Sequence, residues 1–446
     1  MLRGDGMLKR VNGPRQLAGI PIRDAAFPEP FPQGLEYASP ARGTWNIVHT
    51  GMLIPQAHEI FVCAASCLRG VVLTAAELGA QDRFSTVEVR EEDLLDGGME
   101  ELVIEGVCDI LEKLPQKPPA VLVYTSCVHH FAGCDLKLIY DTLLSRYPDV
   151  DFADCYMNPI LRKSGLTPDQ LMRSRLYTLL KPRPIRPDAV AILGNDLPTD
   201  GDSDLMALLR GAGWRVHEIT SCKTYEQYQQ MAESAVYISY YPSAAAGGDM
   251  LSARLGGTHL HLPFSFDFDE IESSLGRLAR ELGVPAPDTA GRRQQCHAAL
   301  ARTRAALGDI PIAIDYTFCP RPLGLAKLLL DSGFRVERVY LDTITGPEKQ
   351  TLEQLKAQHP DLLLYPTVHA AMRFHAPKEP SAFLAIGQKA AHFTNTAHFV
   401  NVVEGGGMWG FQAVLKTLEL MEEAINEEKD LRGLIQIKGM GCSSCL

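Results

Sequence analysis

The chain has 446 residues, more than one hydrophobic core usually supports, so we expect two or three domains. Hydrophobic residues make up 46% of it and charged residues 22%, a composition that is typical of folded globular proteins and excludes disorder. The formal net charge of -11 argues against nucleic acids and anionic membranes as partners, since those require concentrated Lys and Arg.

No stretch reaches the roughly 18 apolar residues that span a bilayer, and residues 1–15 carry charges without the apolar segment of a signal peptide. We therefore expect a cytoplasmic protein. Because thiols stay reduced in that compartment, the eleven cysteines should bind metal or be buried, and should not form disulfides.

The first part of the chain, residues 1–182, is predicted to be an irregular arm followed by an α/β domain. Predicted strands lie at 87–89 and 120–125, and predicted helices at 96–114 and 135–147. Alternation of strands and helices is typical of a parallel sheet covered by helices.

Residues 183–290 and 291–446 repeat this alternation more regularly, which predicts two further α/β domains. The predicted strands are 189–194, 215–220, 236–241, 258–263, 311–318, 335–341 and 361–365. The predicted helices are 204–213, 225–235, 248–255, 270–283, 322–333, 346–358 and 408 to about 426. The predicted fold class is therefore α/β, with three three-layer domains and parallel sheets.

Cys63 and Cys67 lie four residues apart at the start of a helix that is predicted to continue through Glu77. Thiols at a helix N-terminus gain thiolate character from the backbone dipole, and thiolates are the ligands that soft metals prefer. Both cysteines are candidate ligands. The alternative is that they are small residues buried in the first helical turn.

Cys127 follows the predicted strand 120–125, and ligands of parallel α/β sheets bind beyond the carboxyl ends of strands. It is the best single candidate ligand. Cys134 and either His129 or His130 could join it, although Cys134 can equally pack inward.

The spacing of Cys63, Cys67 and Cys127 matches no zinc ribbon. Iron-sulfur clusters tolerate cysteines from separate loops, particularly when a second subunit completes the set. The spacing therefore favours an iron-sulfur site.

The last domain offers a second group of candidates. Cys319 and Arg321 follow the predicted strand 311–318, one as a soft ligand and the other as a fixed positive charge for an anionic cofactor. The alternative is a capped strand end with a paired arginine. Gly405 and Gly406 belong to a glycine run before a helix, which can cradle an anion or let the backbone approach a cofactor. His398 lies just ahead of that run.

Cys442 and Cys445 form a C-x-x-C pair at the chain end, which is either a metal or redox pair or an exposed tail. No P-loop, G-x-G-x-x-G or G-x-S-x-G motif occurs in the required context. Nucleotide-dependent and serine-hydrolase chemistry are therefore not favoured.

Three stretches give the chain a family resemblance: residues 34–45, the segment around Cys67, and the strand end Thr125-Ser-Cys127. With the helix start at 405–411, they resemble the nitrogenase component 1 superfamily. That superfamily includes nitrogenase subunits, their assembly scaffolds, dark-operative tetrapyrrole reductases and methylthio-alkane reductases.

The resemblance implies three Rossmann-like domains and a heterotetramer formed with a paralogous second subunit. It also implies an interfacial iron-sulfur cluster, P-cluster-like or [4Fe-4S], that receives electrons from an ATP-dependent iron-sulfur reductase. Cys67 and Cys127 match two of the family's cluster ligands. The family's first cysteine would fall within 35–44, where this chain has none. Either Cys63 substitutes for it, which we expect, or the cluster has fewer ligands from this side.

Nitrogenase catalytic subunits also hold a larger iron-sulfur cofactor through one cysteine and one histidine. The matching positions are 239–241, which read Ser-Tyr-Tyr here, and a site near Gly406. Dinitrogen reduction is therefore not expected. If a second cofactor is present, we expect Cys319, Gly405 and Gly406 to bind it, with Arg321 and His398 as catalytic residues.

The leading hypothesis is an oxidoreductase subunit that passes low-potential electrons through the interfacial cluster to a small substrate. A methylthio-alkane reductase, which cleaves carbon-sulfur bonds, is preferred because the ligand pattern departs from nitrogenase and the chain is compact. The alternatives are a tetrapyrrole-type reductase subunit, a cofactor-assembly scaffold, and a metal-free α/β binding protein.

Overall fold

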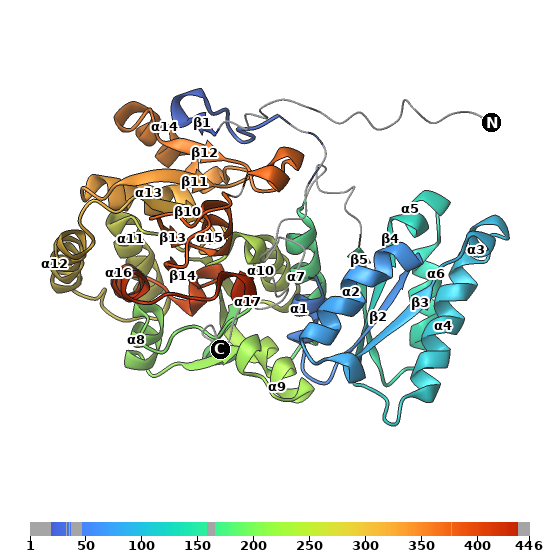
Figure 1. The fold of residues 1–446 in the computed structure, drawn as a ribbon. Helices are drawn as coiled ribbons and strands as arrows, with labels where there is room; N and C mark the ends of the chain where they lie inside the picture. Colours follow the sequence, from blue (N-terminus) through green and yellow to red (C-terminus); the bar gives the residue numbers. More distant parts are fainter. Residues whose placement is uncertain are drawn as a thin grey trace, which may run out of the picture.

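The computed structural model of the protein describes residues 19–32, 34, 36, 47–157, 166–375 and 377–435. Within these residues the strands form three separate sheets, two of four strands and one of six. Figure 1 shows helices packed on both sides of the sheets. The predicted α/β class with parallel sheets is confirmed.

The first sheet has four parallel strands in the spatial order β3, β2, β4, β5. Its strands are β2 (His58–Cys63), β3 (Phe84–Glu88), β4 (Ala120–Ser126) and β5 (Asp151–Met157). Its helices are α1 (Ile47–Met52), α2 (Ala65–Glu77), α3 (Glu91–Leu95), α4 (Met99–Lys113), α5 (Cys127–Ala132) and α6 (Leu136–Arg146). Every residue of β2 and β4 is buried, as expected of central parallel strands.

The second sheet repeats this topology, with parallel strands in the order β7, β6, β8, β9. Its strands are β6 (Arg186–Leu193), β7 (Arg215–Glu218), β8 (Ser234–Ser239) and β9 (Thr258–His261). Its helices are α7 (Pro168–Thr178), α8 (Asp204–Gly211), α9 (Tyr225–Gln229), α10 (Pro242–Leu255) and α11 (Phe268–Glu281).

The third sheet has the order β1, β12, β11, β10, β13, β14, and all of its strands except β1 are parallel. Its strands are β1 (Ile20–Pro21), β10 (Ile312–Asp315), β11 (Val336–Tyr340), β12 (Leu363–Tyr365), β13 (Leu384–Ile386) and β14 (Phe399–Val400). Its helices are α12 (Ala290–Leu307), α13 (Pro322–Asp331), α14 (Lys349–Gln358), α15 (Gln388–Thr394), α16 (Phe411–Asn426) and α17 (Leu431–Ile435).

Two predicted helices differ in extent from those in the structure. The helix predicted at 225–235 ends at Gln229 and continues only as a 3-10 turn to Glu233, where β8 follows directly. The helix predicted from 248 instead begins at Pro242, because proline suits the first helical turn. Gly247 and Gly248 lie inside that helix, where close packing against neighbouring rings outweighs their poor helix propensity.

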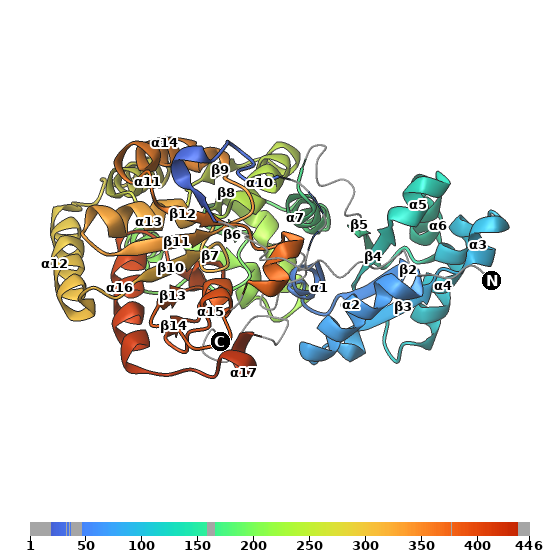
Figure 2. The same cartoon turned by 45° about the horizontal axis from the view of Figure 1, so that its top comes forward.

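The second and third sheets share one hydrophobic core, whereas the first sheet is attached through one face. A single cluster of buried side chains includes Ile192 and Ile238 of the second sheet and Ile314 and Ile386 of the third. The first sheet packs one face on α4 and α6, and the other on α1, α2 and α7. In Figures 1 and 2 the first sheet and its outer helices accordingly lie to one side, with α1 and α7 between them and the rest.

The predicted divisions after residues 182 and 290 fall between the three sheets and remain a prediction. The N-terminal β1 pairs with β12 of the third sheet, so part of the arm lies far from the first sheet. Over the described ranges, no helix is both long and apolar enough to cross a membrane.

We predict that Phe61→Ala lowers the free energy of unfolding of the first sheet and its helices by about 3–5 kcal/mol, because it leaves a cavity in a closed core. The Phe61 ring is fully buried and stacks on Tyr124 with centroids 3.9 Å apart. Phe131→Ala is the matched control: that ring is 70% exposed, so a change within about 0.5 kcal/mol is expected. Urea denaturation followed by circular dichroism measures both variants, and equal losses would contradict the prediction.

Candidate metal centre

The candidate metal centre lies where the first sheet changes its winding direction. From β2 the chain crosses through α2 to β3 on one side, and from β4 it crosses through α5 and α6 to β5 on the other. Crossovers that diverge in this way leave a crevice beyond the carboxyl ends of the two central strands. Those ends are Cys63 of β2 and Ser126 of β4, and Cys127 follows directly.

The structure brings the three predicted cysteines to this crevice from three different elements. Cys63 is the last residue of β2 and is fully buried, Cys67 lies in the first turn of α2 and is exposed, and Cys127 is the partly exposed first residue of α5. The expectation that Cys63 opens a helix is therefore wrong. A buried run without alternation ends in Cys63, and such a run fits a central strand as well as a helix.

The three thiols share one electrostatic environment. The pKa of Cys63 is raised from 9.0 to about 12. Burial is the largest cause, and the nearby thiols of Cys67 and Cys127 contribute to the same rise. Neighbouring thiolates repel each other, so without a cation at least the buried thiol stays protonated at neutral pH. A bound metal would reverse this balance and deprotonate its ligands.

Helix starts flank the crevice. No side chain caps α2 at Ala64, so the first-turn amides next to Cys67 keep free donors. At α5, the side chain of His129 accepts a hydrogen bond at Nδ1 from the backbone N–H of Ser126, at 3.2 Å. Through this bond the His129 side chain caps the first turn of α5. Burial lowers the pKa of its imidazole.

Cys134 does not lie in the crevice. Its side chain packs with the apolar cluster beneath α4 and α6, and burial and the nearby Glu100 raise its pKa. The inward-packing alternative therefore describes this residue. His130 is exposed on α5 beside Phe131.

The donor set fits part of an iron-sulfur cluster and not a site for one metal ion. Within the described ranges, no three His, Cys, Asp or Glu side chains meet closely enough to hold a single ion. Cysteines of a cluster bind different irons, so they stand farther apart than ligands of one ion. Three thiols at a surface crevice match what such a cluster requires, provided that further ligands complete it.

The candidate residues of the last domain do not meet at one site, and each has its own contacts. Cys319 is fully buried, and burial raises its pKa. Arg321 is almost buried and forms an ion pair with Glu270 of α11, so its charge is already balanced. His398 is directed at α16, where its Nδ1 lies 3.0 Å from the carbonyl oxygen of Ala424.

The glycine run joins the second and third sheets. The backbone N–H groups of Glu404 and Gly405 donate to the carbonyl oxygens of Thr317 and Phe318, at 2.8 and 2.6 Å. Those two amides are therefore not available to an anion. Gly405 has a φ of 66°, and a Cβ there would lie 2.8 Å from the hydroxyl of Tyr241.

A second, larger cofactor would have to fit between Cys319 and the glycine run. Tyr241, Phe264 and Phe318 are buried there as part of the shared core. Tyr241 lies near enough to Cys319 for the thiol to raise the pKa of its hydroxyl, after the larger effect of burial. As packed here, these residues do not fit such a cofactor.

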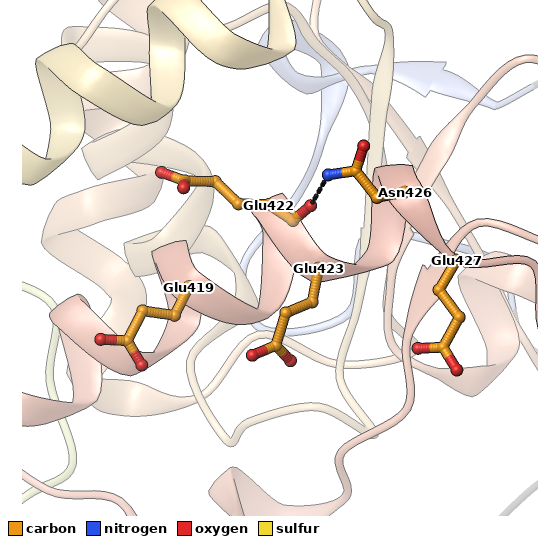
Figure 3. A pocket seen from close by; sticks show the side chains of 5 residues that line it. All are labelled: Glu419, Glu422, Glu423, Asn426 and Glu427. Atoms are coloured by element: carbon orange, nitrogen blue, oxygen red, sulfur yellow. Dashed lines mark hydrogen bonds between the residues drawn. The ribbon is translucent and has the colours of Figure 1, made fainter.

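Two surface hollows lie away from these residues. One of about 520 Å³ lies on the outer face of α16, where Figure 3 shows the side chains that line it: Glu419, Glu422, Glu423, Asn426 and Glu427. The other, of about 330 Å³, lies between α12 and α16. Neither contains a sulfur ligand. Cys442 and Cys445 lie outside the described residues.

His259 and His261, for which the sequence predicted no role, are joined to Ser239 at the carboxyl edge of the second sheet. The available signal was their spacing of two on a predicted strand, which places both side chains on one face.

Comparison with known proteins identifies the family. Residues 48–418 match the family model described as nitrogenase component 1 type oxidoreductase. A search of curated proteins finds no match. Among solved structures, one titled "Nitrogenase Cp1 at pH 6.5" is 12% identical with a TM-score of 0.65, covering 89% of this chain and 94% of that chain. Another, titled "Nitrogenase Cp1 at pH 5", is 14% identical with a TM-score of 0.55, covering 89% and 90%.

At this identity the two structures establish a shared fold, and the family match extends over most of the length. The chain belongs to the nitrogenase component 1 type oxidoreductase family.

Proposed function

We propose that the chain is a subunit of a nitrogenase-like reductase in which Cys63, Cys67 and Cys127 hold part of an iron-sulfur cluster. The observation that carries the proposal is the meeting of three thiols from β2, α2 and α5 at one crevice. Family membership supports an oxidoreductase, and three gathered thiols are the ligands that iron-sulfur chemistry uses.

Each cysteine has a distinct part in this proposal. Cys63, fixed by the hydrogen bonds of a central strand, anchors the cluster from the interior. Cys67 and Cys127 reach it from the surface side, where the α2 dipole stabilises the negative charge of Cys67. A bound cluster supplies one-electron transfer at low potential, and the chain positions it at the surface where a donor can reach it.

The surroundings of the crevice favour an interfacial cluster. Val72 and Leu73 of α2 and Phe131 of α5 are large apolar side chains with 43%, 46% and 70% of their surface exposed. Apolar side chains gathered on a surface are typical of interaction sites. We propose that a paralogous second subunit covers them and completes the ligand set in a heterotetramer, with an ATP-dependent iron-sulfur reductase as electron donor.

For the substrate we propose a small molecule with a carbon-sulfur bond, as in methylthio-alkane reductases. The support is the departure from nitrogenase at 239–241 and Gly406, together with the close packing around Cys319. A tetrapyrrole-type reductase would instead reduce a porphyrin-sized ring. An assembly scaffold would lose its cluster to an acceptor protein, whereas an enzyme keeps it through many cycles.

We predict that Cys67→Ala and Cys127→Ala each lower the iron bound per chain and abolish most reductant-dependent activity, because each leaves an iron site without its thiolate. Iron and acid-labile sulfide analysis of anaerobically purified protein, with its visible spectrum, measures the effect.

Cys222→Ala is the matched control, because Cys222 is partly exposed but lies in the second sheet region, hydrogen-bonded through Sγ to the carbonyl oxygen of Glu218. Its iron content should equal that of the unchanged protein. Iron and sulfide contents that stay the same in both Cys67→Ala and Cys127→Ala would refute the ligand assignment.

We also predict that Cys63 resists alkylation in the folded, metal-free chain at pH 8. Its pKa is raised from 9.0 to about 12, so the reactive thiolate is about a thousandfold scarcer than in the unfolded chain. The stability gained from this shift is present below pH 9 and is lost as the pH rises through about 12. Iodoacetamide labelling with and without urea, read by peptide mass spectrometry, tests this. Rapid labelling of folded Cys63 at pH 8 would contradict it.

A further inference from the structure

Four polar side chains form a continuous chain at the carboxyl edge of the second sheet. Ser239 ends β8, and its register partner His261 ends the neighbouring β9. His259 precedes His261 by two residues, so both rings lie on the same face of the sheet. Asp249 comes from α10, which packs on that face.

The distances join all four residues. Nδ1 of His259 lies 2.7 Å from Oδ1 of Asp249, and Nε2 of the same ring lies 2.9 Å from Oγ of Ser239. That oxygen lies 2.9 Å from Nδ1 of His261. The Asp249 side chain is 77% exposed, the His259 side chain is 4% exposed and Ser239 is buried. The chain therefore leads from water at Asp249 through two buried side chains to His261, which is partly exposed.

The carboxylate at one end fixes the hydrogen-bond direction throughout. A carboxylate only accepts, so Nδ1–H of His259 donates to Asp249 and its Nε2 accepts from the Ser239 hydroxyl. The Ser239 oxygen then accepts from Nδ1–H of His261. Nε2 of His261 keeps a lone pair, and it has no hydrogen-bond partner among the residues that the structure describes.

The end of the chain lies at the junction with the third sheet. Arg277 of α11 donates from Nη1 to the carbonyl oxygen of His261 at 3.1 Å, and Arg321 lies nearby, paired with Glu270. Burial first, then His259 when its ring is protonated, and then the charges of Arg321 and Arg277 lower the pKa of His261 to about 4, against the opposing effect of Asp249. His261 is therefore neutral at pH 7 and its lone pair is available.

Helix α10 covers the four hydrogen-bonded side chains and has a glycine, Gly248, where it comes closest to them. A Cβ on Gly248 would lie 2.3 Å from Nε2 of His259, the atom that bonds to Ser239. Any other residue at 248 would displace the ring and break the chain. The arrangement thus depends on one glycine inside a helix, a position where glycine is otherwise unfavourable.

We propose that Asp249, His259, Ser239 and His261 form a proton relay between water at Asp249 and a ligand that exchanges a proton with Nε2 of His261. When Nε2 takes up a proton, the Nδ1 proton of His261 passes to Ser239. The Ser239 proton passes to His259, and the His259 Nδ1 proton passes to Asp249, which releases it to water. The reverse sequence starts from the state in which Nε2 of His261 carries the proton. That proton goes to the ligand while Asp249 takes up one from water, so one proton is delivered inward. That this relay serves substrate reduction rests on the proposed function, since reduction consumes protons.

The test reads the protons directly on the full chain without any cluster. In protein labelled with 15N-histidine, NMR measures the exchange of the His261 Nδ1 proton with water. Asp249→Ala should slow this exchange by about tenfold or more, although His261 itself is unchanged. Asp249→Glu should restore it. Because Asp249 is largely exposed, neither variant disturbs the core.

The matched control is Asp331→Ala, which removes an exposed carboxylate 3.8 Å from His359 on another part of the chain. It should leave the exchange at His261 unchanged. A static hydrogen-bond network predicts equal exchange rates in Asp249→Ala and the unchanged protein, and that result would overturn the relay. The outcome is separate from the iron analysis, because it requires neither bound iron nor reductase activity.

Discussion

The parallel pairing of β2 with β4 is the constraint on which the candidate centre depends. Backbone register places Val62 opposite Thr125, so the next residues, Cys63 and Ser126, end the two strands side by side. Because the chain leaves these strands in opposite directions, no crossover covers the gap between them. Cys63 and Cys127, 64 residues apart in the sequence, are thus held near each other by the hydrogen bonds of the sheet core, without direct bonds between them.

The same topology occurs in the second sheet, but its carboxyl edge has different chemistry. There the corresponding strand end is Ser239, and its neighbours are imidazoles and tyrosines, not thiols. Thiols suit soft metals, whereas hydroxyl and imidazole groups pass protons. If both proposals hold, one repeated fold offers an electron-carrying edge and a proton-carrying edge. A reductase subunit needs both, since each electron delivered to a substrate is usually accompanied by a proton.

Sequence alone predicted the alternation of strands and helices and the parallel sheets. It also singled out Cys67 and Cys127, whose role as ligands stays a prediction. It failed at β2, because an apolar run that ends in cysteine carries no periodicity to separate a buried strand from a helix start. It also began α10 at Gly248, six residues late, because the run from Pro242 to Gly247 carries no helical periodicity. The structure shows that Gly248 is there for the close approach of His259, a contact between residues that only tertiary packing reveals.

The residues suggested for a second cofactor show why strand-end position is insufficient evidence for a site. Cys319 follows a strand at a sheet edge just as Cys127 does, yet it is fully buried within the core that unites the second and third sheets. Arg321 is paired with Glu270, and the amides of Glu404 and Gly405 are bonded to the loop between β10 and Cys319. At the first sheet no such core closes the edge, because that sheet is attached through its face. Among the described residues Cys67 is exposed and Cys127 is partly exposed, so exposure, more than residue type, distinguishes Cys127 from Cys319.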